Sequence, residues 1–132
     1  MKLSTITQTA TINATPSKVY EAYMDAKKHA EFTGDAARID GKVGGKFKLG
    51  DGYITGTNLE LAPGRKIVQE WSTSEWPEGY PPSRLEITLV PKGNGTLLKM
   101  VHSNVPFEQK DYYAEGWKTY YWEPLKAYFQ KK

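Results

Sequence analysis

The sequence predicts an α+β domain in which a curved antiparallel sheet of six or seven strands is covered by a long C-terminal helix. A period of two in the apolar residues dominates the middle of the chain, whereas helical periods occur only after the first strand and at the C-terminus. The 132 residues are 39% apolar and 25% charged, the balance of an ordinary globular domain. Because the strands are segregated from the helices, the last helix is expected to lie across the apolar face of the sheet.

A strand and two short helices are expected first. Residues 3–14 alternate between apolar and threonine-rich positions, which is typical of a half-buried strand. Thr15 supplies a capping hydroxyl and Pro16 fits the first helical position, so a helix is expected to begin there. A second helix is predicted over residues 27–32, ended near Gly34.

The next six segments are predicted to be strands separated by turns rich in glycine and proline. They are residues 36–40, 46–49, 53–61, 66–73, 84–90 and 96–104. In the fifth, apolar Leu85, Ile87 and Leu89 alternate with polar residues, which indicates one covered and one wet face and therefore an antiparallel sheet. In the sixth, Met100 and His102 are assigned to the covered face.

The C-terminal segment carries an aromatic stripe. Tyr113, Trp117, Tyr121 and Leu125 recur every four residues, which predicts one long helix with an aromatic face. Pro124 lies inside it and has no amide proton, so a bend or local irregularity is expected there. Such a stripe suits either a packed core or the wall of a ligand cavity, and the sequence leaves both open.

Composition excludes several classes of site. The chain has no cysteine, so thiolate metal sites, iron–sulfur clusters and cysteine nucleophiles are excluded. The net charge is only +3, and the densest basic group, Lys42, Lys46 and Lys48, alternates as a solvated strand face does, so no nucleic-acid partner is expected. Residues 41–46 resemble a phosphate-binding loop only superficially, because the spacing is one residue short.

The sequence shows no pattern typical of a signal peptide, a membrane span or a metal site. The N-terminus lacks the apolar core of a signal peptide and no stretch is long enough to span a bilayer, so a cytoplasmic location and no membrane partner are expected. His29 and His102 are the two histidines, with no ligand spacing between them, so no metal or other cofactor is expected. His102 is interpreted as a hydrogen-bonded structural residue; an acid–base role would need an acidic or tyrosine partner. No catalytic residue is identified.

Four segments resemble the C-terminal domain of the family of activators of the heat-shock protein 90 ATPase. They are Gly44-Gly45-Lys46-Phe47; Leu61-Ala62-Pro63-Gly64-Arg65-Lys66-Ile67-Val68 with Trp71; Trp76-Pro77-Glu78-Gly79; and Glu115-Gly116-Trp117 with Tyr120, Tyr121 and Leu125. The resemblance spans nearly the whole chain, so residues 1–132 are expected to form a single domain of this type, without the separate N-terminal domain of the full-length activator. It implies the helix-grip fold of the START-like (SRPBCC) superfamily, with a cavity between sheet and helix.

The leading hypothesis is that a monomeric, non-catalytic protein binds a small, mainly apolar ligand in that cavity. The candidate lining residues are Trp71, Trp76, Tyr80 and Ile87, with Trp76 and Tyr80 contributed by a loop that could frame the mouth. The alternative is a co-chaperone-like module that binds a heat-shock protein 90 chaperone through its surface. A cyclase- or hydrolase-type enzyme is the third hypothesis.

Overall fold

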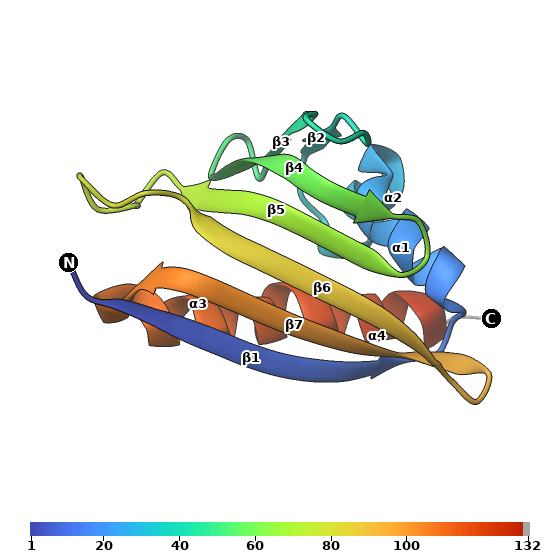
Figure 1. The fold of residues 1–132 in the computed structure, drawn as a ribbon. Coiled ribbons are helices and arrows are strands. Elements are labelled where there is room, and N and C mark those ends of the chain that lie inside the picture. The colour runs from blue at the N-terminus through green and yellow to red at the C-terminus, as the bar shows by residue number, and fades with distance from the viewer. Residues whose placement is uncertain (131–132) are drawn as a thin grey trace.

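A computed structural model describes residues 1–130 (Figure 1). The elements in chain order are β1 (Leu3–Ile12), α1 (Pro16–Met24), α2 (Ala26–Thr33), β2 (Ala37–Ile39), β3 (Lys46–Leu49), β4 (Ile54–Ala62), β5 (Lys66–Thr73), β6 (Ser83–Lys92), β7 (Gly95–Pro106), the 3₁₀ turn η1 (Phe107–Gln109), α3 (Lys110–Trp117), the π-helical turn η2 (Lys118–Trp122) and α4 (Glu123–Gln130). The predicted α+β class and the order of elements are confirmed. The two residues after 130, part of the predicted domain 1–132, lie outside the described residues.

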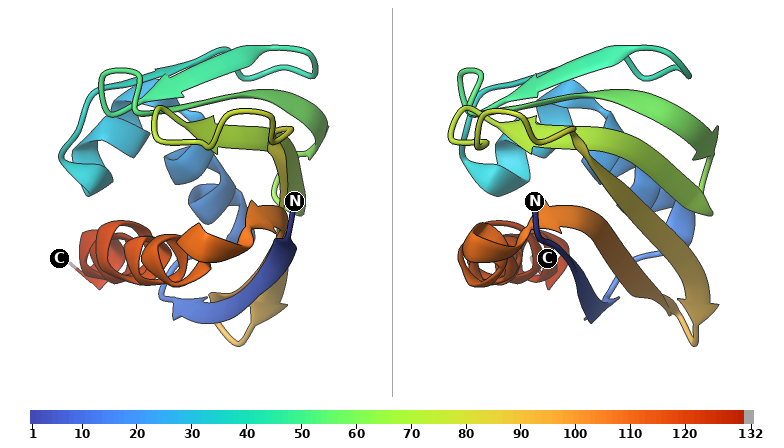
Figure 2. Two further views of the ribbon diagram at one scale, coloured as in Figure 1. Left: turned by 90° about the vertical axis from the view of Figure 1, so that its left-hand side faces the viewer. Right: turned by 60° about the vertical axis from the view of Figure 1, so that its left-hand side comes forward.

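The seven strands form one antiparallel sheet in the order β1-β7-β6-β5-β4-β3-β2. Strands β1 and β2 therefore lie at opposite edges, and α1 and α2 carry the chain from one edge to the other. The sheet curves around the continuous helix formed by α3, η2 and α4, which lies across its concave face (Figure 2). This is the helix-grip fold.

The two short helices have different N-termini. The Thr15 side chain makes no capping hydrogen bond, contrary to the expectation; its carbonyl accepts the first helical bond from the Val19 amide at 3.0 Å instead. The α2 helix is capped by Asp25, whose carboxylate accepts from the Lys28 amide at 3.0 Å. It ends as predicted at Gly34, whose φ of 79° is the left-handed conformation that favours glycine.

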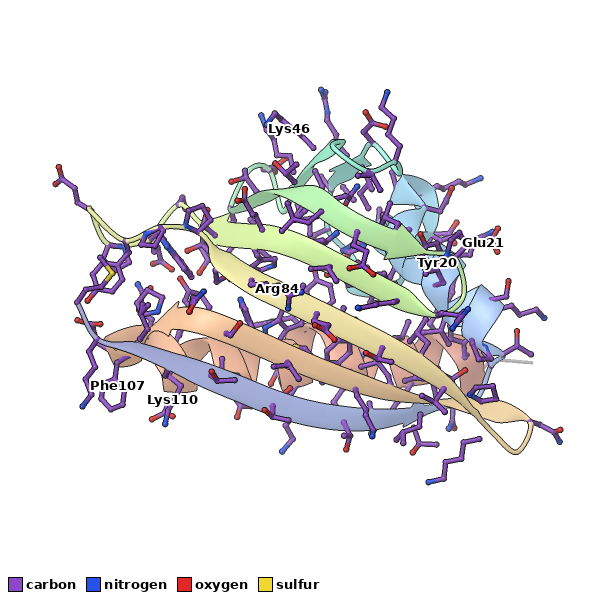
Figure 3. All side chains as sticks on the ribbon, viewed as in Figure 1. Tyr20, Glu21, Lys46, Arg84, Phe107 and Lys110 are labelled. Atoms are coloured by element: carbon purple, nitrogen blue, oxygen red, sulfur yellow. The ribbon has the colours of Figure 1, made fainter. Side chains whose placement is uncertain are left out.

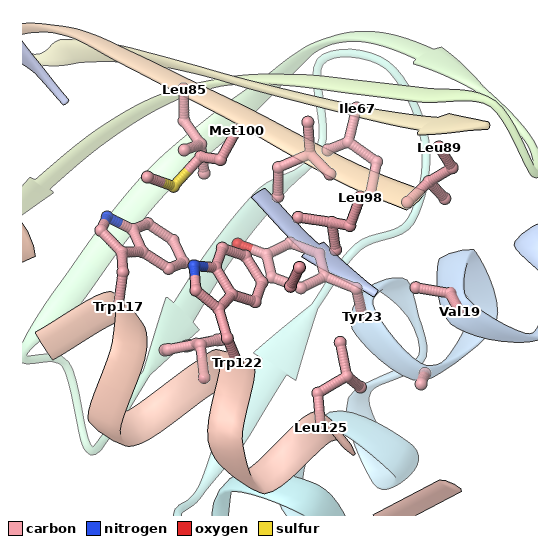
Figure 4. Close-up of a cluster of buried hydrophobic side chains, with 14 of the residues drawn as sticks. Val19, Tyr23, Ile67, Leu85, Leu89, Leu98, Met100, Trp117, Trp122 and Leu125 are labelled. Carbon is pink, nitrogen blue, oxygen red and sulfur yellow. The ribbon is translucent and has the colours of Figure 1, made fainter. Parts of the chain in front are cut away.

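The core lies between the concave face of the sheet and the C-terminal helix. Leu85, Ile87 and Met100 are each at most 1% exposed and face the helix, as their alternation predicted. Trp117 and Trp122 lie beneath them (Figure 4). Leu98 and His102 are also buried, so the face assigned to β7 is confirmed.

The irregularity predicted at Pro124 is a π-helical turn over Lys118–Trp122, in which the Glu123 amide donates to the Lys118 carbonyl five residues earlier. A regular α-helix would bring the Pro124 ring against the carbonyl four residues before it, and the wider turn relieves this contact. The turn also changes which side chains share a face. The Trp117 and Trp122 rings stack with centroids 5.3 Å apart and 13° between their planes, although residues five apart diverge on an α-helix.

The convex face of the sheet is polar. Arg84 points away from the helix (Figure 3) and its guanidinium donates to the Glu86 carboxylate at 2.8 Å. Lys46 and Lys48 are exposed, as expected of a solvated strand face. Among the described residues, no helix is both long and apolar enough to cross a bilayer.

Candidate functional site

A cavity of about 430 Å³ lies between the C-terminal helix and the opposite edge of the sheet. One wall is residues 112–121 of the C-terminal helix, and the other is formed by α2 with the residues after it and by the turn that joins β3 to β4. Trp71 of β5 closes the inner end. The cavity is open to solvent on one side, where the lining residues Tyr112 and Tyr120 are exposed.

Aromatic rings form the inner surface of the cavity. The indoles of Trp71 and Trp117 lie 5.6 Å apart between centroids, and the Trp71 and Tyr113 rings are nearly perpendicular with centroids 5.4 Å apart. Tyr121 follows, 4.8 Å from Trp117. All four side chains are at most 7% exposed, so they form a rigid apolar floor.

The mouth is lined by the next stripe of the same helix. Tyr112 and Tyr120 are 62% and 68% exposed, and Gly116 lies between them at four-residue spacing. A Cβ atom at Gly116 would meet only the Tyr120 ring, at 4.0 Å, so the glycine leaves open space there. Glu115, also on the helix, accepts a hydrogen bond from the Thr119 hydroxyl at 2.8 Å, and Asp35 lines the facing wall.

His29 contributes the buried polar group of the cavity. Its Nδ1 lies 2.8 Å from the Tyr23 carbonyl oxygen, which can only accept, so Nδ1 carries the proton. Nε2 is then an acceptor and receives the Tyr121 hydroxyl at 2.9 Å. Burial lowers the pKa of His29 despite the bond to the Tyr23 carbonyl. Burial also raises the pKa of Tyr121 well above its ordinary value, with smaller contributions from Tyr23 and Asp35, so both groups are held neutral.

His102 lies in the core rather than among the residues that line the cavity. The Trp117 indole N–H donates to its Nδ1 at 3.0 Å, which places the proton on Nε2. Nε2 then donates to the Ser83 hydroxyl at 2.7 Å, and that hydroxyl donates to the Trp71 carbonyl at 2.6 Å. The prediction that His102 is hydrogen-bonded is confirmed, and burial lowers its pKa to about 3.

Of the four residues predicted to line the cavity, the structure places one in the lining and three elsewhere. In the described chain, Trp71 lines the cavity and Trp76, Tyr80 and Ile87 do not. Ile87 is 1% exposed in the core, since its strand β6 lies near the middle of the sheet. The loop between β5 and β6 folds back on itself: the Trp76 indole donates to the Pro81 carbonyl at 2.9 Å and covers Trp71 at 6.1 Å. Tyr80 reaches the Glu108 carboxylate at 3.5 Å, outside the cavity.

The polar and outer parts of the cavity lining were not predicted from the sequence. His29 shares an i, i+3 spacing with the buried Phe32, a signal that marks it as inward-facing on α2. Tyr112, Gly116 and Tyr120 form a second stripe beside the aromatic one, visible as an i, i+4 series. Nothing in the linear sequence places either set opposite residues 49–54.

Comparison with known proteins identifies the family. Residues 13–130 match the family model "Activator of Hsp90 ATPase homolog 1-like protein". The chain belongs to this family. It is 30% identical over 124 residues to the human activator of 90 kDa heat shock protein ATPase homolog 1, and 32% identical over 115 residues to the homolog from Dictyostelium discoideum. These alignments cover 94% and 86% of this chain, but the chain spans only about a third of the length of either relative, 36% and 30%.

Solved structures share the whole fold. An HSP90 activator from Plasmodium falciparum superposes with a TM-score of 0.87 at 27% identity, and the match covers 96% of both chains. The Aha1 dimer from Colwellia psychrerythraea, at 19% identity, has a TM-score of 0.82 and covers 96% of both chains, which shows the fold alone. The resemblance to the family and its helix-grip fold is therefore confirmed.

Proposed function

We propose that this member of the family binds a small, mainly apolar molecule in the cavity beside its C-terminal helix and does not transform it chemically. The observation that carries the proposal is the cavity itself. Its volume of about 430 Å³ falls in the range of roughly 300–1,000 Å³ of small-molecule sites. Its floor is aromatic, and His29 and Tyr121 supply a few polar groups among the rings, as such sites commonly do.

Maintaining open space beside a core costs stability, because the groups that line it lose packing contacts. Gly116 is informative in this respect. A larger side chain would meet little resistance there and would also be a better helix former, by about 1 kcal/mol for alanine. A glycine at this position supports a mouth that is kept open for a ligand.

The hydrogen bonds of both histidines support the absence of catalysis. A Ser83–His102 contact of 2.7 Å resembles a nucleophile and its base, but a base must accept the serine proton. Nε2 of His102 is a donor here, because Trp117 donates to the other ring nitrogen. His29 similarly has its Nδ1 proton bonded to a backbone carbonyl and its Nε2 occupied by Tyr121. Neither ring has a free basic nitrogen facing the cavity.

The test compares two leucine substitutions on the C-terminal helix. A panel of a flavonoid, a sterol and a medium-chain fatty amine is titrated into the protein, with tryptophan fluorescence and backbone NMR shifts as readouts. Gly116→Leu fills the mouth and should weaken binding at least tenfold. Ala127→Leu, at an exposed position of α4 outside the lining, should leave it unchanged. Equal binding by both variants, or shifts that avoid residues 112–121, would contradict the proposed site.

Catalysis is tested on the same ligands. Each should be recovered unchanged after prolonged incubation with the protein. A product whose formation disappears in His102→Gln, with the fold intact, would overturn the non-catalytic proposal.

A second candidate function is interaction with a heat-shock protein 90 chaperone. It is favoured by the relatives, which are named as activators of that chaperone's ATPase and align over 86–94% of this chain. Adding this chain to such a chaperone should then change its ATPase rate or NMR spectrum. The Gly116→Leu variant distinguishes the two functions, because filling the cavity should leave a surface interaction intact. Absence of any effect at high concentration would eliminate this candidate.

A further inference from the structure

We infer that the cavity selects organic cations, namely amines or quaternary ammonium groups attached to an apolar body, over neutral and anionic molecules of the same shape. This rests on the proposed function, since it specifies the class of ligand that the cavity takes. Three features of the cavity favour cations: the sign of the charged residues that line it, the arrangement of its aromatic rings and the neutrality of its histidine.

The charges that line the cavity have one sign. The chain contains 18 Lys and Arg residues against 15 Asp and Glu, so an unselective surface would carry slightly more positive charge. Among the described lining residues, however, the charged side chains are two carboxylates, Asp35 and Glu115, and no Lys or Arg is present. Neither carboxylate forms a salt bridge within residues 1–130. A cleft lined by one sign of charge concentrates ions of the opposite sign.

The two carboxylates belong to opposite walls of the cavity. Asp35 follows α2, on one wall, and it lies close enough to Tyr121 for its charge to help raise the pKa of that phenol. Glu115 is on the helix that forms the other wall, where the Thr119 hydroxyl donates to it at 2.8 Å. Each wall of the cavity therefore contributes one negative group to its lining.

The aromatic rings supply the second attraction. The faces of Trp and Tyr rings carry negative electrostatic potential and attract ammonium groups within about 6 Å of the ring centroid. The rings that line the cavity and its mouth stand at varied angles, with 86° between Trp71 and Tyr113, 56° between Trp117 and Tyr121, and 66° between Tyr112 and Tyr113. These inclined rings all line one cavity, a composition that resembles the wall of an aromatic cage.

His29 adds no opposing charge. It is the one cationisable side chain among the described lining residues, and burial lowers its pKa, so the ring stays neutral at physiological pH. An anionic ligand such as a fatty acid would meet two solvent-exposed carboxylates without a compensating cation, and like charges repel one another. The cavity is thus expected to reject carboxylates that have a suitable apolar body.

The test uses three probes with one phenol body. They are 3-hydroxyphenyltrimethylammonium, 3-tert-butylphenol and 3-hydroxybenzoate, and the first two have nearly identical shapes. Calorimetric titration is expected to give at least tenfold tighter binding of the ammonium than of the tert-butyl probe, about 1.4 kcal/mol. Because the neutral probe costs less to desolvate, a merely apolar cavity would bind the tert-butyl compound more tightly.

Charge-neutral variants locate the effect. Glu115→Gln and Asp35→Asn should each weaken binding of the ammonium probe three- to tenfold and leave binding of the neutral probe unchanged. Glu123→Gln, the same chemical change on the same helix outside the lining, should alter neither affinity. Indole N–H resonances report the site, because Trp71 and Trp117 line the cavity and Trp76 and Trp122 do not.

The outcomes separate this inference from the function on which it rests. If the neutral probe binds within the cavity as tightly as the ammonium, or the carboxylate binds best, cation selection is wrong and ligand binding stands. If no probe, and no member of the earlier panel, binds at millimolar concentration, both are wrong. Ammonium binding that is unaffected by Glu115→Gln and Asp35→Asn would also overturn the inference.

Discussion

Protonation of His102 should make the fold sensitive to acid, and the size of this effect follows from its surroundings. The ring is fully buried, its Nδ1 accepts from Trp117, and burial lowers its pKa to about 3. In the unfolded chain the pKa returns to about 6.5. Between these values the unfolded state binds more protons than the folded state, so the free energy of unfolding rises with pH over this window and falls on acidification.

The expected loss can be worked out from the two pKa values. On going from pH 7 to pH 5, the unfolded ring becomes almost fully protonated whereas the folded ring stays neutral, which lowers the free energy of unfolding by about 2 kcal/mol. The contribution of His102 levels off only well below pH 3, where the ring is protonated in both the folded and the unfolded state. His29, whose pKa burial also lowers, adds a loss of the same sign.

The assay is urea denaturation of the wild type and of His102→Gln at pH 7 and pH 5. Glutamine keeps an amide in the core but cannot take up the proton, so the variant should lose about 2 kcal/mol less than the wild type over this interval. Because His29 and every carboxylate are present in both proteins, the difference isolates His102. Equal losses in the two proteins would refute the argument. So would an NMR titration of folded wild type in which the His102 ring protonates near pH 6.5, a measurement that remains available if the variant fails to fold.

Two further predictions concern stability and helix geometry. Asn58→Ala should lower the free energy of unfolding by about 3 kcal/mol in urea titrations, because the buried side-chain amide donates to the Asp40 and Lys42 carbonyls at 2.8 and 3.1 Å. The control Asn94→Ala, at an exposed position, should change the free energy of unfolding by less than about 0.5 kcal/mol. Equal effects of the two substitutions would contradict a stabilising role for the buried Asn58 hydrogen bonds. Pro124→Ala removes the ring that opposes a regular α-helix and should weaken the far-UV exciton signal of the stacked tryptophans, whereas an unchanged signal would show that core packing alone maintains the π-helical turn.

The fold was predictable because its signals are local. Alternation along β6 and β7 determines which residues are buried, since a strand turns successive side chains to opposite faces. The irregularity near Pro124 follows from one missing amide proton. The type of irregularity could not be predicted, because a kink and a π-helical turn relieve the same contact between the proline ring and the backbone carbonyl. The stacking of Trp117 on Trp122, which accompanies the π-helical turn, is visible only in the three-dimensional structure.

The cavity was less predictable because its walls come from segments distant in sequence. Aromatic periodicity located Trp117 and Tyr121 on the inner face of the helix, and both do line the cavity. Trp76 was placed at the mouth on the ground that loops often gate sites, but its indole bonds back to the Pro81 carbonyl within its own loop. No local pattern indicates that the turn at residues 49–54 faces the helix.

The π-helical turn connects the core to the cavity. On a regular α-helix, the stripe through Trp117 and Tyr121 would leave Trp122 about 100° from Tyr121 around the helix axis. The wider turn lets Trp122 join the core, where its indole donates to Gln8 of β1 at 2.8 Å. Trp122 thereby anchors the helix to the β1 edge of the sheet, while Tyr121 bonds to His29 of α2 on the other side. The helix is held from both sides, which keeps its cavity face at a fixed distance from α2 without filling the space between them.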